Sequence, residues 1–418
     1  MRIKFSFQLL KALLPRILIT FIILIFIRAG TFLPVPGIDH NDLAAAIQQN
    51  LVAKNLIRTF LGDKIIIIGL FTLNIFPAIN ATIILQFLIG FSPQLAKLQK
   101  EGDFQGRREI SRLTRNITVV LAIIQSIGLT LYLRPILFNW NLMLASQLVL
   151  WLTAGAMIVL WLSEVITDYG LGNGTSVLVY INIVSNLPNL IDKIINENRD
   201  NTAVLSVVSM SGLVLLILFA LYAIVLLQNS TLIINLISSK RLSRTSSNSY
   251  AKKKSESYLP LRFNQAGVMP IILTTSFLVL PNYLINLGIF QSLNFLTDFK
   301  WIYWIGYFVL ILAFSSFYSS IVLNPKDISD QLQKSAVKIP GVRPGIQTIF
   351  YLKQEIQRIT LMGATLLAFI TIVPNFIEST LNITSLSGLS TTSFLILGGV
   401  ILDLKREISN IYYSEIYR

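Results

Sequence analysis

Uncharged polar side chains gather near the start of three apolar segments of this sequence, where they could line a path for a polar substrate. The three sets are Asn74, Asn80, Thr82 and Gln86; Asn173, Thr175 and Ser176; and Asn264, Gln265, Thr274 and Thr275. Unpaired polar groups are costly in hydrocarbon, so such side chains border protein or a water-filled cavity. No charged residue lies at the middle of any apolar segment, although ion-coupled carriers usually need one there. The sequence therefore predicts a polar but uncharged pathway.

The chain contains few candidate residues for metal binding or for nucleophilic catalysis that depends on cysteine or histidine. Cysteine is absent, and His40 is the only histidine. Thiolate metal sites, disulfides and histidine-rich metal cages are thereby excluded. The glycine-rich run at 170–175 lacks the Gly-Lys-Ser/Thr ending of a phosphate-binding loop, and we interpret it as a tight turn between helices. We expect no enzyme activity, no metal and no cofactor.

Membrane helices must position the polar groups. Hydrophobic residues make up 54% of the chain and charged residues only 13%, against about a quarter charged in soluble domains. Apolar runs long enough to cross a bilayer lie at about 16–33, 74–92, 114–133, 145–166, 174–190, 204–227, 266–287, 302–323, 359–376 and 387–402. We therefore predict an all-α, polytopic membrane protein with ten transmembrane helices.

The distribution of charge orients these helices. With a cytoplasmic N-terminus, the cytoplasmic segments hold 26 Lys and Arg against 12 Asp and Glu, whereas the opposite loops hold 7 against 8. This asymmetry satisfies the positive-inside rule. The basic N-terminus resembles a secretory signal peptide, but Arg28 and nine later spans favour an uncleaved first span.

Three basic loops on the predicted cytoplasmic side, at 93–115, 228–262 and 324–358, are candidate docking sites. Topology alone explains most basic loops. The second has a serine-rich centre that is typical of a flexible linker. The third holds Arg343 on a tip made of glycines and prolines, which favours directed contacts with carboxylates or phosphates of a partner. The candidate docking residues are Arg343, Lys240, Arg241, Arg107 and Arg108.

The second and seventh spans begin with related sequences. Residues 74–79 (NIFPAI) align with residues 267–272 (GVMPII), so that a proline lies two residues before an isoleucine in both. Two five-span halves related by pseudo-symmetry would produce this match, as would two unrelated proline kinks. The pseudo-symmetric reading gives an N-terminal half at 1–190 and a C-terminal half at 191–418.

Five motifs, in order along the chain, resemble the SecY family, the channel subunits of the Sec protein translocase. They are PVPG at 34–37, KEGDFQGRREISRLTR at 100–115, DYGLGNGTS at 168–176, LPLRFNQAGVMP at 259–270 and NPKDISDQLQKSAVKIPGVRPG at 324–345. The resemblance covers essentially the whole chain. In the second basic loop the chain departs from the family, because it reads LIIN at 232–235 where a paired arginine and a proline are common.

The resemblance implies an hourglass pore between the two halves, constricted by a ring of apolar side chains and closed by a plug at about 61–73. Matched motif by motif, the ring falls on Ile75, Ile79, Thr175, Val179, Ile272 and Ile396. Thr175 departs from the apolar pattern, and the plug is bulkier than the small, Gly/Ser-rich plug usual in the family.

The resemblance also implies a lateral slit between the second and seventh spans, through which signal sequences and transmembrane segments reach lipid. The slit residues are Ile83, Gln86, Asn264, Gln265, Thr274 and Thr275. The implied partners are a SecE-like small subunit, the SecA motor ATPase or a ribosome, and secretory polypeptides; a SecG-like third subunit stays open. The implied function is translocation of unfolded polypeptides, driven by the docked partner.

Two questions stay open at the level of sequence. High Ile, Asn and Lys usage suits a plastid-encoded form in the thylakoid membrane, with a bacterial inner membrane as the alternative. On fold grounds alone, a pseudo-symmetric ten-helix bundle could equally be a secondary transporter or solute channel. Such a protein would show a midplane ionisable site or a small-molecule pocket, and the sequence indicates neither.

Overall fold

The computed structural model of the 418-residue chain describes most of its helical segments. The described residues are 7–35, 69–92, 94–95, 98, 104–132, 141–197, 218–219, 221–238, 257–264, 267, 270–271, 273–274, 300–381 and 391–416. Every statement about structure below concerns these residues.

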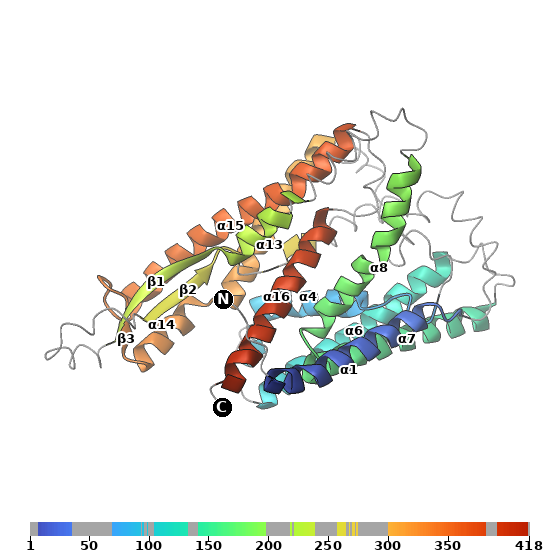
Figure 1. Cartoon of the computed structure of the whole chain (residues 1–418), viewed down its shortest axis with the longest axis horizontal. Helices are drawn as coiled ribbons and strands as arrows, with labels where there is room; N and C mark the ends of the chain where they lie inside the picture. Colours follow the sequence, from blue (N-terminus) through green and yellow to red (C-terminus); the bar gives the residue numbers. More distant parts are fainter. Residues whose placement is uncertain are drawn as a thin grey trace. The chain divides into compact units, whose positions relative to one another are not determined.

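Nine helices dominate the described part of the chain (Figure 1). They are α1 (Phe7–Thr31), α4 (Phe76–Phe91), α6 (Phe104–Tyr132), α7 (Leu142–Tyr169), α8 (Gly174–Glu197), α13 (Lys300–Val322), α14 (Pro325–Lys334), α15 (Ile346–Leu381) and α16 (Thr391–Ile416). All except α14 overlap predicted spans, although α1, α15 and α16 extend beyond them. The predicted sixth and seventh spans lie largely outside the described residues, so the count of ten stays a prediction.

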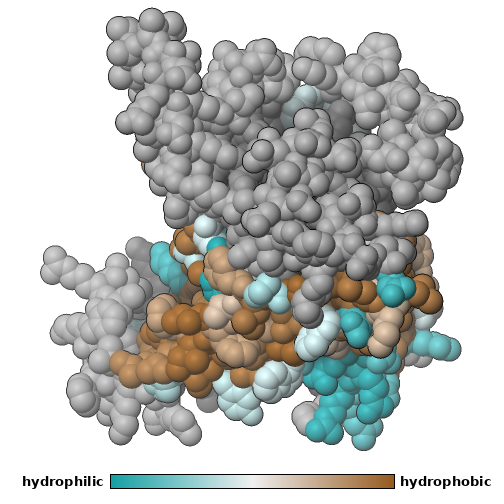
Figure 2. Space-filling view, turned by 90° about the vertical axis from the view of Figure 1, so that its right-hand side faces the viewer, coloured by the Kyte–Doolittle hydropathy of each residue, from teal (hydrophilic) through white to brown (hydrophobic). Residues whose placement is uncertain are grey.

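Five segments of the described helices are long and apolar enough to cross a membrane. They are Leu13–Thr31, Arg108–Leu131, Leu142–Tyr169, Trp304–Lys334 and Ile346–Val373, and Phe76–Phe91 and Gly174–Ser185 are shorter apolar helices. Many of their large apolar side chains are exposed, such as Phe21 of α1 at 63%. Figure 2 shows a broad hydrophobic surface on one face, with hydrophilic side chains gathered at one end. Such a surface suits contact with lipid.

The chain divides into two compact units. The first comprises Met1–Ala203, Ser385–Leu389 and Val400–Arg418, and the second comprises Val204–Thr384 and Ser390–Gly399. These bounds describe compactness, and the predicted pseudo-symmetric halves stay a prediction. The residues of α16 belong to the second unit up to Gly399 and to the first unit from Val400.

In the first unit, α7 packs against α1, α6 and α8. The core face of α7 includes Leu148, Leu152 and Val159, all at most 2% exposed. At one end of this unit, Leu13 of α1 and Leu171 are buried against apolar side chains of α16, including Leu404 and Ile408. The first unit therefore has a helical core centred on α7.

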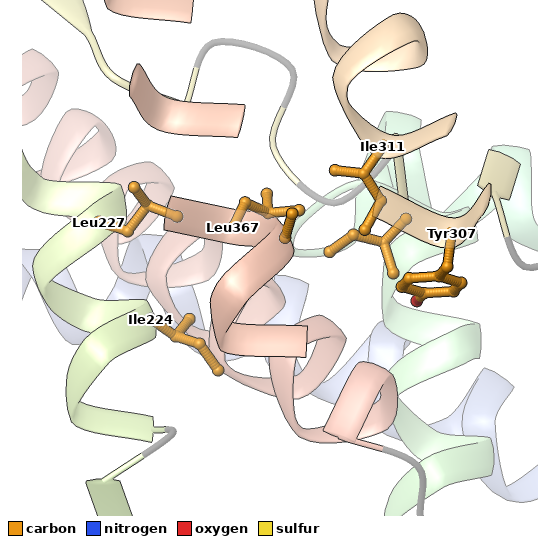
Figure 3. Packing of buried hydrophobic residues seen from close by; sticks show 7 residues of the cluster. Ile224, Leu227, Tyr307, Ile311 and Leu367 are labelled. Carbon is orange, nitrogen blue, oxygen red and sulfur yellow. The ribbon is translucent and has the colours of Figure 1, made fainter. Parts of the chain in front are cut away.

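In the second unit, α13 and α15 pack together over a core that also takes in helical residues 221–229. Ile224, Leu227, Tyr307, Ile311 and Leu367 are buried in this cluster (Figure 3). This core fixes α15 against α13. It thereby positions the turn at 339–345 that precedes α15 in the chain.

A small antiparallel sheet joins two of the basic loops within the second unit (Figure 1). The strands are β1 (Thr231–Ser238), β2 (Ser257–Arg262) and β3 (Val337–Lys338), in the order β2-β1-β3. Thr231 pairs with Arg262 and Leu236 with Ser257, while Ile237 pairs with Lys338. This sheet was not predicted from the sequence. The serine-rich centre of the loop lies outside the described residues.

Alternation of side chains explains the strand β1. Ile234 is buried at 6% and packs in a cluster with Leu352, Ile356 and Ile359 of α15, whereas its neighbour Ile233 is 57% exposed. One face of the hairpin thus covers the start of α15, as a period of two requires.

Candidate pore lining and docking turn

The approach to α4 is an irregular stretch of buried backbone at 69–75. Phe71, Leu73 and Ile75 are at most 2% exposed. The Leu70 N–H donates to the Leu33 carbonyl at 3.0 Å, and the Thr72 hydroxyl donates to the Gly69 carbonyl at 2.7 Å. Non-helical backbone is tolerated at membrane depth only where protein or water satisfies it, and here the segment after α1 does so.

Three glycines make room for this stretch. A Cβ added at Gly155 of α7 would collide with the Leu70 carbonyl oxygen, and one at Gly69 would collide with the Thr31 carbonyl oxygen. A Cβ at Gly30 of α1 would strike the Phe71 ring. The entry to α4 is therefore seated against α1 and α7 through backbone contacts that only glycine permits. Residues 69–73 are the only described part of the predicted plug.

Asn74 forms the last corner before α4. Its backbone has a φ of 48°, in the left-handed region that few residues other than Gly, Asn and Asp adopt readily. The Asn74 Oδ1 accepts a hydrogen bond from the Ile75 N–H at 2.8 Å, and the Nδ2 donates to the Asn182 Oδ1 of α8 at 3.0 Å. Pro77 lies in the first turn of α4, where its missing N–H costs nothing.

The predicted ring residues of the first unit lie at the start of α4 and on α8. Ile75 and Ile79 are buried, at 1% and 7% exposed, and Val179 is half-buried on α8. Thr175 lies in the first turn of α8, where its hydroxyl donates to the Asn173 Oδ1 at 2.8 Å. The contact between Asn74 and Asn182 brings the start of α4 level with the third turn of α8, closer to Val179 than to Thr175.

Asn182 is a residue that the sequence analysis missed. It follows Thr175 and Val179 at the i, i+4, i+7 spacing of one helix face, and this spacing could have identified it. The remaining predicted ring residues belong to the second unit. Ile396 is half-buried on α16, and Ile272 lies outside the described residues. The complete ring stays a prediction.

The predicted slit residues are also divided between the units. On α4, Ile83 is buried, and the Gln86 Oε1 is buried without a hydrogen-bond partner among the described residues. In the second unit, the Asn264 Nδ2 donates to the Gly267 carbonyl at 2.8 Å, and the Thr274 hydroxyl donates to the Pro270 carbonyl at 2.7 Å. Gln265 and Thr275 lie outside the described residues.

The docking turn, which we define as residues 339–345, lies between β3 and α15. Gly341 and Gly345 have φ values of 78° and 100°, so both positions need a residue without a side chain. Ile339 is buried in the cluster under the sheet, and the Thr348 hydroxyl of α15 donates to the Arg343 carbonyl at 2.9 Å. The Arg343 side chain is exposed. The turn thus holds its arginine outward from a fixed backbone.

The basic start of α6 contributes a second charged surface. Arg107 and Arg108 lie in its first turns, and the Arg108 side chain is exposed. Arg115 forms a two-pronged ion pair with Glu164 of α7, with N–O distances of 2.9 and 2.8 Å. Lys240 and Arg241 lie outside the described residues.

Comparison with known proteins settles the family. A sequence model of SecY matches residues 69–405. The chain belongs to the SecY family. A protein translocase subunit SecY from Trieres chinensis is 53% identical over 415 residues, which cover 97% of each chain. A SecY subunit from Synechocystis sp. is 40% identical over 415 residues, covering 96% of this chain and 92% of its own length.

Solved structures of this family have the same fold. A structure described as that of a protein conducting channel aligns with a TM-score of 0.65 at 16% identity, covering 97% of this chain and 94% of the other. Sec61 in a canine ribosome-channel complex from the endoplasmic reticulum aligns with a TM-score of 0.62 at 15% identity, covering 97% and 94%. The transporter alternative gains no support from these relatives.

Proposed function

We propose that this SecY-family protein is a channel that moves unfolded, signal-sequence-bearing polypeptides across a membrane and releases transmembrane segments sideways into lipid. The observation that carries the proposal is the buried, glycine-seated entry to α4, which holds Ile75 and Ile79 in place. An apolar constriction needs such a scaffold, because its side chains must close tightly after each polypeptide has passed.

An apolar ring would seal the resting channel against ions. Moving a bare charge from water into a low-dielectric constriction is very costly, and a narrow apolar ring also loses its water. An extended polypeptide can push aside flexible isoleucine side chains and fill the gap itself. Ile75, Ile79 and Val179 supply suitable side chains from two neighbouring elements of the first unit.

A lateral slit would pass transmembrane segments into lipid. About 20 apolar residues suffice to span the hydrocarbon core, and they partition there spontaneously. The Gln86 Oε1 is buried without a hydrogen-bond partner in the described part of the chain, which supports a role for α4 in this slit. A polar side chain at such a surface finds partners when a substrate segment or water replaces its present neighbours.

The energy for translocation must come from a partner. Sec61, a structural relative, was solved in complex with a ribosome. By analogy we infer that a ribosome or a SecA-like motor docks on the basic loops, with a SecE-like subunit, and in some assemblies a SecG-like one, beside the helices. The outward Arg343 on the docking turn is suited to two-pronged bonds with carboxylates or phosphates.

We further propose that the protein resides in the thylakoid membrane of a plastid, with its basic loops in the stroma. Relatives from Trieres chinensis and Guillardia theta support this location. The relative from Synechocystis sp. supports the alternative location, a bacterial inner membrane. Fractionation of the source cells, followed by protease treatment of intact thylakoids, distinguishes the two.

Reconstitution tests the function directly. The full chain is inserted into vesicles with a SecE-like subunit and supplied with a SecA-like motor, ATP and a precursor carrying a signal sequence. The expected result is precursor protected from added protease, and loss of protection when the signal sequence is deleted. Gradient-driven uptake of a small solute without any protected precursor would favour the transporter alternative.

Arg343→Glu tests the docking turn. Replacing attraction by repulsion at a docking site costs about 2 to 5 kcal/mol, so motor-stimulated translocation should fall steeply while insertion stays normal. The matched control is Arg244→Glu, the same change of charge in the serine-rich part of the second loop. Equal and small effects from both variants would show that Arg343 serves only to set the membrane topology.

A further inference from the structure

The pair formed by Asn74 and Asn182 holds the two ring-bearing elements of the first unit together. Asn74 immediately precedes Ile75, and Asn182 lies one turn beyond Val179. Their amides meet at 3.0 Å. A bond at this place fixes the separation of the start of α4 from α8, and hence the separation of the apolar side chains that these elements carry.

The orientation of the Asn74 amide is determined by its surroundings. Its Oδ1 accepts from the Ile75 N–H at 2.8 Å, so the Nδ2 is the atom available to donate to Asn182. The turn itself does not require this amide, because glycine adopts a φ of 48° without strain. Asparagine is the residue that combines a left-handed backbone with a side-chain donor.

Asn182 has no evident structural need for an amide either. Asparagine is a poor helix former, and an amide within an apolar helix is costly unless it is bonded. Among the described residues, its side-chain amide has one bond, and that bond is to Asn74. Both residues are therefore best explained by their contact with each other.

We propose that Asn74 and Asn182 form a latch that positions Ile75 and Ile79 against α8 and so sets how tightly the resting channel is sealed. This inference rests on the proposed channel function. The latch is uncharged and adds no barrier to ions by itself; it acts through the apolar side chains beside it. Its loss should loosen the closed state without preventing translocation.

A double-mutant cycle separates a latch from two independent residues. Asn74→Gly keeps the left-handed backbone and removes the amide, and Asn182→Ala removes the partner. Asn182→Ala should raise the resting ion current through reconstituted channels about fivefold, the effect of losing one net hydrogen bond. Asn74→Gly should raise the current at least as much, because it also loses the bond from the Ile75 N–H. Both variants should admit precursors with weakened signal sequences. The double variant should be no leakier than the leakier single variant, because the interaction is lost only once.

Ser185→Ala is the matched control on α8. The Ser185 hydroxyl donates only to the Asn182 carbonyl of its own helix, at 2.9 Å, so the variant should keep the wild-type current. Wild-type currents from both single variants would overturn the proposal. So would a double variant whose increase equals the product of the two single increases.

A covalent version removes any ambiguity about folding. The natural chain has no cysteine, so Asn74→Cys with Asn182→Cys gives one unique thiol pair, which a short bis-thiosulfonate reagent can join. The same channels should leak when reduced and seal when cross-linked. A current that cross-linking leaves unchanged would also overturn the latch. Protease-protected precursor in wild-type vesicles reports the channel function separately, so failure of the function and failure of the latch are distinguishable.

Discussion

The helix starts at 74–77 and 267–270 each contain a residue with a left-handed backbone, but different side-chain contacts stabilise them. Asn74 and Gly267 occupy equivalent positions three residues before a proline, and both have a left-handed backbone, with φ values of 48° and 62°. The first start is tied to α8 through the Asn74 amide, whereas the second is closed locally by the Asn264 Nδ2 on the Gly267 carbonyl. Pseudo-symmetric halves would produce this shared backbone, and the halves stay a prediction.

The two starts therefore differ in the use of their asparagines: Asn74 bonds a helix that is distant in sequence, and Asn264 bonds its own turn. The first start packs closely against glycines of α1 and α7. Substitutions at these positions, which are far away in sequence, should therefore disturb it. The second start also has a glycine neighbour, because a Cβ at Gly363 of α15 would collide with the Phe263 carbonyl oxygen, so the contrast between the starts lies in their asparagine bonds. Four predictions test this contrast.

The largest effect is expected from Gly155→Val on α7. The added side chain would collide with the Leu70 carbonyl, and overpacking against backbone should cost about 3 kcal/mol, the upper end of the usual range. Thermal unfolding of the detergent-solubilised protein measures the loss. The control is Gly128→Val on α6, where a Cβ meets nothing within 4 Å. Equal stability of the two variants would show that the first start does not depend on this contact.

Ile79→Asn and Ile272→Asn compare the predicted ring in the two halves. Each replaces apolar contact by a group that holds water, which should favour the open state by about 1 to 3 kcal/mol. Single-channel recording in a planar bilayer measures the resting leak. Similar leaks support a ring shared by both halves. A leak from Ile79→Asn alone would place the seal in the first unit.

Gly267→Val tests the backbone of the second start. A Cβ at this position meets nothing within 4 Å, so the expected cost of about 1 to 2 kcal/mol comes from the left-handed backbone alone. Gly267→Asn should cost less, since asparagine tolerates this region and stands at the equivalent position of the first start. Thermal unfolding ranks the two variants, and an equal loss from both would exclude backbone strain as the cause.

The smallest effect is expected from Asn264→Ala. Losing its bond to the Gly267 carbonyl should cost about 0.5 to 1.5 kcal/mol. Ser320→Ala removes an exposed hydroxyl that donates within its own helix, to the Phe317 carbonyl at 2.7 Å, and should be neutral. Hydrogen exchange of the amides after residue 264 reports the loosening. Unchanged exchange in Asn264→Ala would mean that the turn closes without its side chain.

Much of the helical architecture could be predicted from the sequence, because long apolar runs need a helix in lipid. The bounds of α15 could not be predicted: it begins at Ile346, ahead of the predicted 359, since its first turns carry polar residues such as Lys353 and Glu355. The strand β1 was missed because its alternation is short and lies in a basic loop. Its partners β2 and β3 are distant in sequence.

The polar residues at the helix starts were interpreted in the sequence as the lining of a watery path. In the structure, three of these amides bond backbone atoms of the turns themselves: Asn74 to Ile75, Asn173 to Thr175 and Asn264 to Gly267. Composition identifies an amide but not its partner. The long-range partner of Asn74 was invisible because Asn182 lies 108 residues away in sequence.

The helix α15 connects the small sheet to the helical core of the second unit. Its 36 residues extend about 54 Å at 1.5 Å per residue, well beyond the roughly 30 Å of a hydrocarbon core. Near one end of α15, Leu352 and Ile356 pack against the sheet. Further along, ahead of Pro374, Leu367 and Ala368 pack against α13 within the second unit. The docking turn is joined directly to the start of α15, so a partner bound at Arg343 would act directly on this helix and, through it, on the α13 packing of the second unit.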